Sequence, residues 1–153
     1  MSESRYSKYI ITEDLMPPMA PEMIELMDGQ AQAGNTLDRT LLLGLQDSIL
    51  KGTFFAGCEI IWGLTGNGPV TIEAPHTHDF DEVIGFVGTD KSQPRALNGE
   101  IEFWLGGEQH LITQTCLIFI PRGLTHCPIY FREVNTPIVM FEAGNDTAYE
   151  KGG

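Results

Sequence analysis

The sequence predicts an all-β domain, a sandwich or barrel of short strands. Seventeen glycines and nine prolines in 153 residues indicate frequent turns and few long helices. From residue 37 onward, segments rich in β-branched and aromatic residues alternate with turn residues. A hydrophobic fraction of 42% over this length is enough for the core of one domain. Many short strands with Gly/Pro-rich turns are typical of two-layer or closed β architectures.

The individual strands can be read from apolar periodicity, and they number eight or nine. Residues 70–74 and 100–105 alternate apolar and polar side chains, as half-buried strands do. Residues 82–88 and 116–121 are continuous apolar runs, typical of strands buried on both faces. Further strands are expected at 40–45, 53–64, 126–131 and 137–143. The aromatic residues expected mainly in the core are Trp62, Phe86, Phe119 and Phe141.

The first 36 residues differ in composition from the rest and are predicted to form an extended arm. Prolines in residues 17–21 argue against regular structure there. Pro21 favours a short helical turn through Leu26, which Gly29 would end. We expect the arm to lie over the barrel or over a partner subunit, with a frayed tail as the alternative. The barrel is predicted over residues 37–145, with a C-terminal tail at 146–153.

Charge and cysteine usage exclude several classes of function. The net charge of −12 argues against nucleic acid as a partner, because phosphate backbones require a basic face. No apolar run reaches the roughly 20 residues of a membrane span, and no secretory signal is visible. Three cysteines without regular spacing suit reduced thiols in a cytoplasmic protein. An acidic surface attracts cations, including metal ions.

The segment APHTHDFDEVIGFVG (74–88) carries the clearest chemical signal. His76 and His78 are two residues apart, so on a strand both imidazoles face the same side. A bend after His78 can bring Glu82 toward the same space. Imidazole nitrogens and a carboxylate oxygen suit a divalent ion such as iron, manganese, nickel, copper or zinc.

A second segment, CLIFIPRGLTHCPIY (116–130), is predicted to be a strand–turn–strand unit. Pro121 ends the first strand because it cannot donate to a ladder. Gly123 permits a tight turn with positive φ. His126 then opens the next strand and can point into the barrel.

Together the two segments resemble the two motifs of the cupin superfamily, Gly-x5-His-x-His-x3-4-Glu-x6-Gly and Gly-x5-Pro-x-Gly-x2-His-x3-Asn. The resemblance covers about residues 40–143. It implies a double-stranded β-helix, or jelly roll, that holds one divalent metal ion through His76, His78, Glu82 and His126. Four positions depart from the motifs, and all four shape turns or support the barrel rather than bind metal: Val70, Gly88, Thr115 and Tyr130.

Residues around the four ligands have further possible roles. Tyr130 follows His126 by four residues on a strand and can face the same interior, as a hydrogen-bond donor or an acid/base, or it packs. Asp79 and Asp81 either orient an imidazole or are solvated carboxylates. Cys127 is expected to face away from His126. Three residues complete the set: Arg95 and Arg122 as anion contacts or surface cations, and His110 as an exposed hairpin residue.

Three His ligands and one Glu leave coordination positions for water, substrate or oxygen. The favoured hypothesis is a mononuclear metalloenzyme, a dioxygenase-type oxidoreductase that acts on a small oxygenated organic molecule. The alternatives are a non-redox isomerase or decarboxylase, a non-catalytic small-molecule binding cupin, and a barrel that the metal only stabilises. A homodimer is expected, since barrel edges need cover that the arm can supply across a two-fold axis.

Overall fold

The computed structural model describes residues 4–149 and 151 and contains two short helical segments and nine strands. The helical segments are η1 (Ser7–Tyr9) and α1 (Pro21–Gln32). The strands are β1 (Thr36–Leu45), β2 (Phe55–Thr65), β3 (Val70–Glu73), β4 (Glu82–Gly88), β5 (Ala96–Leu105), β6 (Glu108–Gln114), β7 (Cys116–Ile120), β8 (His126–Val134) and β9 (Ile138–Gly144). In the described part of the chain, neither helical segment is long and apolar enough to cross a membrane.

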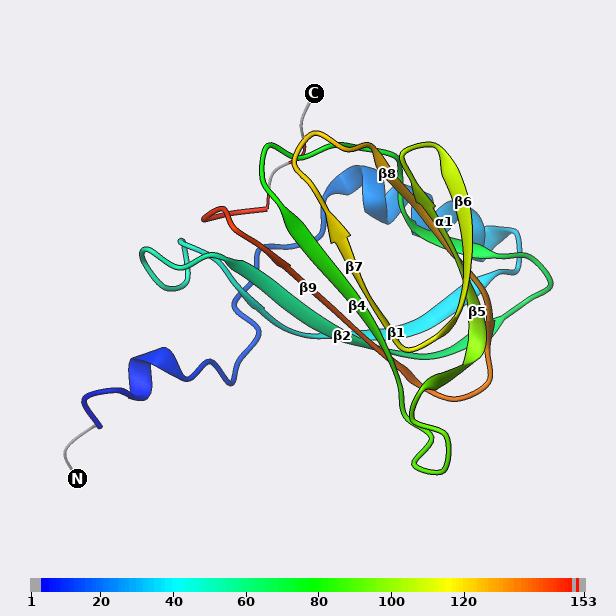
Figure 1. The fold of residues 1–153 in the computed structure, drawn as a ribbon, viewed down its shortest axis with the longest axis horizontal. Helices are drawn as coiled ribbons and strands as arrows, with labels where there is room; N and C mark the ends of the chain where they lie inside the picture. Colours follow the sequence, from blue (N-terminus) through cyan, green and yellow to red (C-terminus); the bar gives the residue numbers. More distant parts are fainter. Residues whose placement is uncertain (1–3, 150, 152–153) are drawn as a thin grey trace.

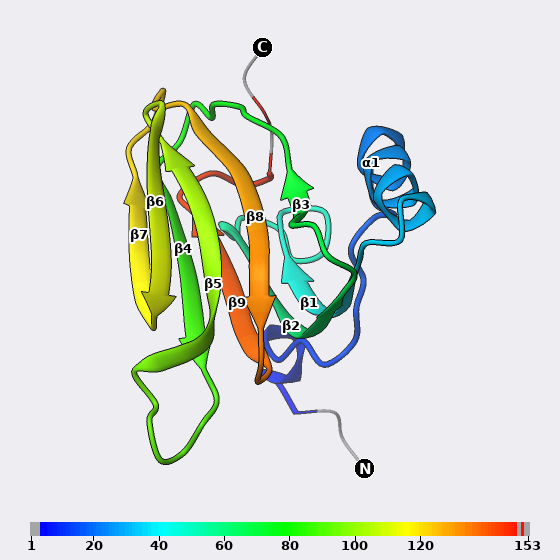
Figure 2. The same cartoon turned by 90° about the vertical axis from the view of Figure 1, so that its right-hand side faces the viewer.

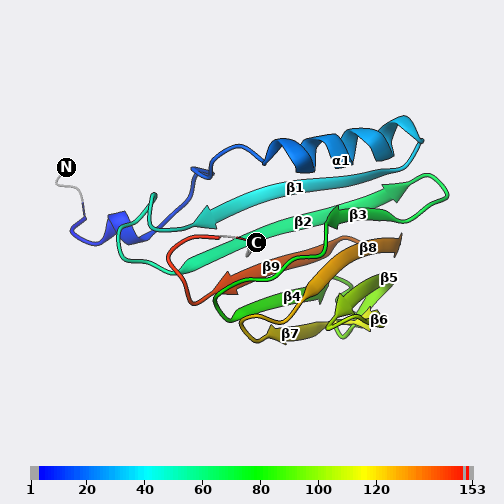
Figure 3. The same cartoon turned by 90° about the horizontal axis from the view of Figure 1, so that it is seen from above.

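The strands form two antiparallel sheets that face each other, as the all-β prediction requires (Figures 1 and 3). One sheet has the order β1-β2-β9-β4-β7, and the other has the order β3-β8-β5-β6. Most neighbouring strands are far apart in the chain, for example β4 between β9 and β7, whereas β1 pairs with β2 and β5 with β6. This long-range pairing brings residues of the first and second His-containing segments together at one end of the barrel.

The hydrophobic core fills the space between the two sheets. Phe86 of β4 and Phe131 of β8 are fully buried and meet edge to face across the layers, with ring centroids 6.3 Å apart. Branched aliphatic residues from both sheets, such as Ile61, Ile101 and Ile138, surround this pair and are equally inaccessible. The core therefore holds the two sheets together and leaves the end where β4 and β8 begin for polar residues.

Two predicted core aromatics lie on the outside. Trp62 of β2 is 45% exposed and Phe119 of β7 is 60% exposed, because each alternates with inward-facing neighbours and points away from the second sheet. Phe141 is half-buried on that same outer face, where its ring covers Gly85 of the adjacent strand. Apolar periodicity identified the strands correctly but not which face each residue occupies.

The helix is longer than the sequence suggested. It begins at Pro21 as predicted, but it passes through Gly29 and ends at Gln32. The reason is a tertiary contact of Gln30, whose side-chain amide donates to the Thr71 carbonyl (2.9 Å) and accepts from the Thr71 N–H (2.8 Å). This pairing with the edge strand β3 offsets the cost of a helical glycine, about 1 kcal/mol. Figure 2 shows α1 lying outside the sheets, next to β3 and β1.

The central region also contains a strand that the pattern did not reveal. β6 follows β5 through a tight turn at Gly106 and Gly107, both with positive φ. Its side chains are almost all exposed, so it lacks the apolar alternation of a half-buried strand. β5 itself begins at Ala96, four residues before the strand that was predicted over residues 100–105.

Candidate metal centre

The four predicted ligands converge at one end of the barrel. The Nε2 atoms of His76 and His78 are 3.1 Å apart. The Oε2 atom of Glu82 is 3.2 Å from Nε2 of His78 and 3.2 Å from Nε2 of His126. His78, Glu82 and His126 are buried, and His76 is half-buried. Three imidazole nitrogens and one carboxylate oxygen therefore surround a single small space.

Backbone hydrogen bonds hold the two His-containing segments in register. His76 and His126 form an isolated antiparallel bridge, with both N–H···O distances at 3.0 Å. The Gly123 N–H donates to the His78 carbonyl at 2.8 Å, and Gly123 has a φ of 79°. The turn after β7 thus uses glycine as predicted, because this backbone conformation is costly for other residues. The ligands are positioned by the sheet framework rather than by a mobile loop.

Hydrogen bonds at Nδ1 orient two of the imidazoles. Nδ1 of His76 lies 2.7 Å from the Ala74 carbonyl, and Nδ1 of His126 lies 3.0 Å from the Leu124 carbonyl. A carbonyl oxygen only accepts, so Nδ1 carries the hydrogen in both rings. Nε2 is then the atom of each ring that is left to bind a metal, as in metal-binding histidines, and Nε2 of His126 faces Glu82 Oε2 at 3.2 Å. The His78 ring stacks on Phe80 at a centroid distance of 4.4 Å.

The protonation states of the cluster also suit a cation. Burial acts to raise the pKa of Glu82, but the adjacent His126 and His78 imidazoles outweigh it and hold that pKa below its ordinary value. Burial lowers the pKa of His76, so its ring is neutral at neutral pH. Metal binding requires this combination of a carboxylate and neutral imidazoles.

A buried polar atom without a hydrogen bond is costly, and the cluster contains two. Within residues 4–149 and 151, no group completes a hydrogen bond to Glu82 Oε2 or to His126 Nε2. A cation between the two atoms would satisfy both. The donor set, its convergence and these two atoms fit a mid-series divalent ion.

Two predictions about β8 were wrong, and one backbone angle explains both. Cys127 has a φ of 67°, which interrupts the alternation of the strand directly after His126. Cys127 therefore faces inward, and its Sγ lies within 4.8 Å of ligand atoms of His76 and His126. Tyr130 consequently points to the outer face, between buried Ile129 and Phe131, and lines neither cavity at the cluster. The structure does not bring Tyr130 to the metal centre.

Tyr149 takes the place at the cluster that the sequence suggested for Tyr130. Its hydroxyl lies 3.1 Å from Nε2 of His76, and its ring packs at 4.8 Å from His78. Burial raises the pKa of Tyr149, so the hydroxyl keeps its proton. No local sequence pattern indicated a role for Tyr149, because it belongs to the predicted C-terminal tail and reaches the cluster only after β9 folds.

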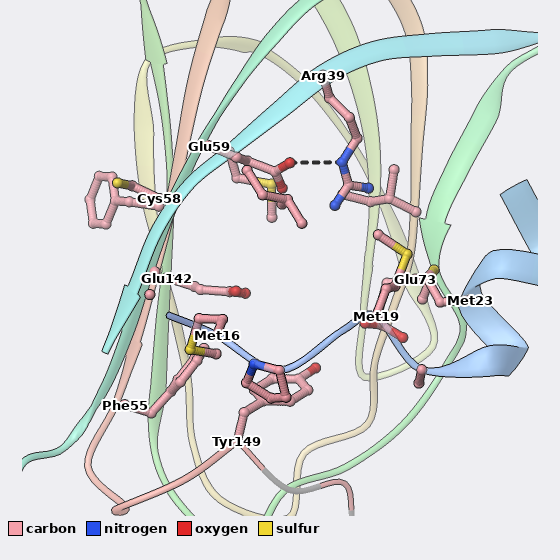
Figure 4. A pocket seen from close by; sticks show the side chains of 18 of the residues that line it. Met16, Met19, Met23, Arg39, Phe55, Cys58, Glu59, Glu73, Glu142 and Tyr149 are labelled. Atoms are coloured by element: carbon pink, nitrogen blue, oxygen red, sulfur yellow. Dashed lines mark ion pairs between the residues drawn. The ribbon is translucent and has the colours of Figure 1, made fainter. Parts of the chain in front are cut away.

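A small cavity of about 80 Å³ at the cluster opens into a larger one of about 760 Å³. Three acidic residues line both: Glu59, Glu73 and Glu142. Arg39 of β1 also lines both cavities, and it forms an ion pair with Glu59 at 2.8 Å (Figure 4). Burial and the neighbouring Glu82, Glu59 and Glu73 charges raise the pKa of Glu142 to about 8. Glu142 is therefore a neutral carboxylic acid at neutral pH.

The other candidate residues lie outside the cluster. Asp81 accepts from the Arg122 N–H at 2.9 Å and from Asn145 at 3.2 Å, so it braces the turn after β7 and orients no imidazole. Asp79 and Arg95 are exposed. The Arg122 side chain is 60% exposed and 3.8 Å from Asp81, as expected for a surface cation. His110 is exposed on β6.

Comparison with known proteins extends this picture at the level of the fold. No protein-family model matches the chain, and no characterised protein matches it in sequence. Among solved structures, it is similar to an oxalate oxidase in complex with the substrate analogue glycolate (TM-score 0.53, 17% identity) over 99% of this chain and 66% of the other. A recombinant oxalate oxidase, also with glycolate, matches with a TM-score of 0.51 and 16% identity over 95% and 63% of the two chains.

An RmlC-like cupin from Shewanella frigidimarina also aligns, with a TM-score of 0.41 and 14% identity over 98% of this chain and 95% of the other. The chain spans about two thirds of the length of the oxalate oxidases. The two-sheet architecture and the matches to the two oxalate oxidases show that the chain has a cupin fold. Its distinguishing features are one jelly-roll barrel, a four-residue candidate metal centre and an N-terminal arm beside the barrel mouth.

Proposed function

We propose that this chain is a mononuclear metal-dependent enzyme that acts on a small oxygenated organic molecule. The observation that carries the proposal is the convergence of His78, Glu82 and His126, whose ligand atoms all lie within 4.8 Å of one another, with Nε2 of His76 3.1 Å from Nε2 of His78. A bound divalent ion would supply Lewis acidity or, if redox-active, the capacity to activate oxygen. We favour a dioxygenase-type oxidoreductase, because this reaction class best suits a metal that His and Glu ligands hold with coordination positions left open.

The residues around the centre have roles that do not depend on the identity of the metal. Tyr149 packs edge-on against the His76 and His78 rings and limits their movement. Phe80 stacks on His78 and, with the buried core behind it, keeps bulk water away from the cluster. Cys127 contributes a buried thiol whose pKa burial raises, so it remains protonated. The site is thus a pre-organised pocket that adjoins the larger cavity.

One observation supports a second candidate, a non-redox isomerase or decarboxylase. Glu142 lines the same small cavity as His76, Glu82 and His126, and its pKa of about 8 makes it a proton donor at neutral pH. A carboxylic acid held neutral beside a centre that polarises a carbonyl suits general acid catalysis. Sequestration of a small molecule without turnover is the remaining alternative.

Elemental analysis tests the proposal most directly. The purified protein should contain, or take up after chelator treatment, one equivalent of a mid-series divalent metal. The His126→Ala variant should lose most of it, and His110→Ala should retain it, because His110 is exposed on β6 away from the cluster. Equal metal content in the two variants would refute the site. Oxygen uptake by iron- or copper-loaded protein separates the dioxygenase from the non-redox alternatives.

We also propose that two copies of the chain pair in solution. The outer face of the larger sheet exposes Trp62, Leu117 and Phe119, and the arm exposes Tyr6 and Tyr9. Exposed apolar side chains gathered on one face are typical of protein interfaces. Sedimentation should give a dimer that Phe119→Glu dissociates; a monomeric wild-type protein would refute the pairing.

A further inference from the structure

The large cavity is more than the entrance to the metal centre. Its volume of about 760 Å³ is within the range of small-molecule sites, and far exceeds what a two-carbon molecule needs. The inner end adjoins the small cavity at the His/Glu cluster and is polar, with Glu59, Glu73 and Glu142 lining both cavities, whereas the outer part is lined largely by apolar residues. The cavity therefore has two chemically different halves.

The N-terminal arm builds the outer half. Met16, Met19 and Met23 all line the cavity, together with Phe55 of β2 (Figure 4). Met16 lies directly against Gly44 of β1, so closely that a Cβ at Gly44 would collide with the Met16 side chain. Methionine side chains are flexible and polarisable, and they adapt to apolar ligands of different shapes.

The arm is held in this position by contacts that lie outside the cavity. Gln30 pairs with both backbone groups of Thr71 at 2.8 and 2.9 Å. Asn35 accepts from the Gly68 N–H at 3.0 Å. These bonds anchor the C-terminal end of α1 to the smaller sheet, and the segment from Met16 to Leu26 extends from that anchor across the cavity mouth. The apolar wall is thus part of the fold.

The charges inside the cavity disfavour an anionic ligand. The lining cations in the described part of the chain are Arg39 and Lys151, and each is already paired, with Glu59 and Glu73 respectively. Asp14 and Glu22 add acidic groups at the arm. Buried Arg39 Nη1 has no hydrogen-bond partner among the described residues, so it can donate to an uncharged acceptor such as a carbonyl.

Taking the proposed metal-dependent function as its basis, we propose that the substrate is an uncharged molecule with an oxygen-bearing head at the His/Glu cluster and an apolar tail against Met16, Met19 and Met23. A carbonyl between head and tail would accept from Arg39. Small dicarboxylates are disfavoured because their second carboxylate would face Glu59 and Glu73 without a free cation. The arm is then the element that selects the substrate.

The test uses a ligand series with one chelating head and different tails, namely 3,4-dihydroxybenzoate and its methyl, propyl and butyl esters. The protein is loaded with redox-inert Zn²⁺, and affinities are measured by calorimetry. Burial of each added methylene should strengthen binding about fourfold, so the butyl ester should bind roughly ten- to sixtyfold more tightly than the methyl ester. The free acid should bind more weakly than the methyl ester, which has the same head.

Two variants locate the tail. Met19→Gln combined with Met23→Gln makes the outer wall polar at similar volume, and should reduce the butyl-over-methyl preference to less than about threefold without changing methyl-ester affinity. Ile24→Gln is the matched control, because Ile24 lies on the same helix but is exposed and does not line the cavity. The control should keep the full preference.

A second readout needs no metal. The neutral dye Nile red should bind the metal-free protein with enhanced fluorescence, and the double variant should weaken that binding at least fivefold. If no ester binds the Zn²⁺-loaded protein while Nile red behaves as described, the metal-dependent function fails and the apolar half stands. The inference is overturned by any one of three results. The butyl ester binds no more tightly than the methyl ester, the free acid binds as tightly as the methyl ester, or the double variant binds Nile red like the wild type.

Discussion

Glu142 makes the stability of this protein depend on pH in a way that one substitution should remove. Its pKa rises from an ordinary value of 4.5 to about 8 in the folded chain, because burial and the Glu82, Glu59 and Glu73 charges disfavour the carboxylate. The folded state therefore binds this proton more tightly than the unfolded state. By linkage, folding stability falls as the pH rises from about 4.5 to about 8 and is constant above that range.

The size of the effect follows from the same two pKa values. Their difference corresponds to an upper limit of about 5 kcal/mol. Glu142 lines a cavity that solvent enters, so screening reduces the expected loss to about 2–3 kcal/mol. Glu142→Gln keeps the shape and the hydrogen-bonding capacity but removes the titration. The variant should match the wild type at pH 5 and exceed its stability by about 2–3 kcal/mol at pH 9.

Urea unfolding at pH 5 and pH 9 measures this difference. Chelator-treated protein is required, because a divalent ion at Glu82 would neutralise one of the charges that raise the pKa of Glu142. Glu108→Gln is the matched control: its side chain is 81% exposed, so its stability should follow the wild type at both pH values. If the wild type and Glu142→Gln change stability in parallel between pH 5 and pH 9, Glu142 does not carry a raised pKa and the reasoning is wrong.

Three further predictions concern the framework around the site. A Cβ at Gly88 would collide with the backbone carbonyl of Ala96, so Gly88→Ala should lower the free energy of unfolding by about 3–5 kcal/mol. Gly29 lies on the open face of α1, so Gly29→Ala should raise the free energy of unfolding by about 0.5–1 kcal/mol. Equal effects of the two substitutions in thermal unfolding would contradict this. Gln30→Ala should lower the free energy of unfolding by about 1–3 kcal/mol, because it leaves both Thr71 backbone groups unpaired. Gln32 is exposed, so Gln32→Ala should change the stability little. Denaturant titration distinguishes the two variants. Cys127 is buried, and burial raises the pKa of its thiol. Maleimide should therefore label half-buried Cys58 in the native protein and Cys127 only after unfolding. If peptide mass mapping finds Cys127 labelled in the native protein, the site is open to solvent.

The four proposed ligands could be found in the sequence because the signals that place them are local. Two imidazoles two residues apart on an extended chain face the same side, and a Pro-x-Gly-x-x-His turn aims a third across the barrel end. The strands could be found for a similar reason, since apolar periodicity reflects burial within one element. β6 was not predicted, because a strand with exposed side chains on both faces lacks this apolar periodicity.

Other features were decided by contacts between distant parts of the chain. The helix continues through Gly29 because Gln30 meets an edge strand 41 residues away. The choice between Cys127 and Tyr130 as the inward-facing residue depends on a positive φ at Cys127 that no propensity predicts. Trp62 and Phe119 are exposed because burial depends on which face of a sheet meets the other sheet.

By itself, the sequence determined the all-β class and the four residues of the candidate metal centre, because both depend on residue type and on spacings of a few residues. The tertiary structure alone decided what surrounds that centre. Tyr149, Glu142 and Arg39 come from the C-terminal segment, β9 and β1, and they meet the cluster only after long-range strand pairing. The arm becomes a cavity wall for the same reason. Burial and neighbouring charge set the pKa of Glu142, and both are properties of the assembled barrel rather than of any segment of the chain.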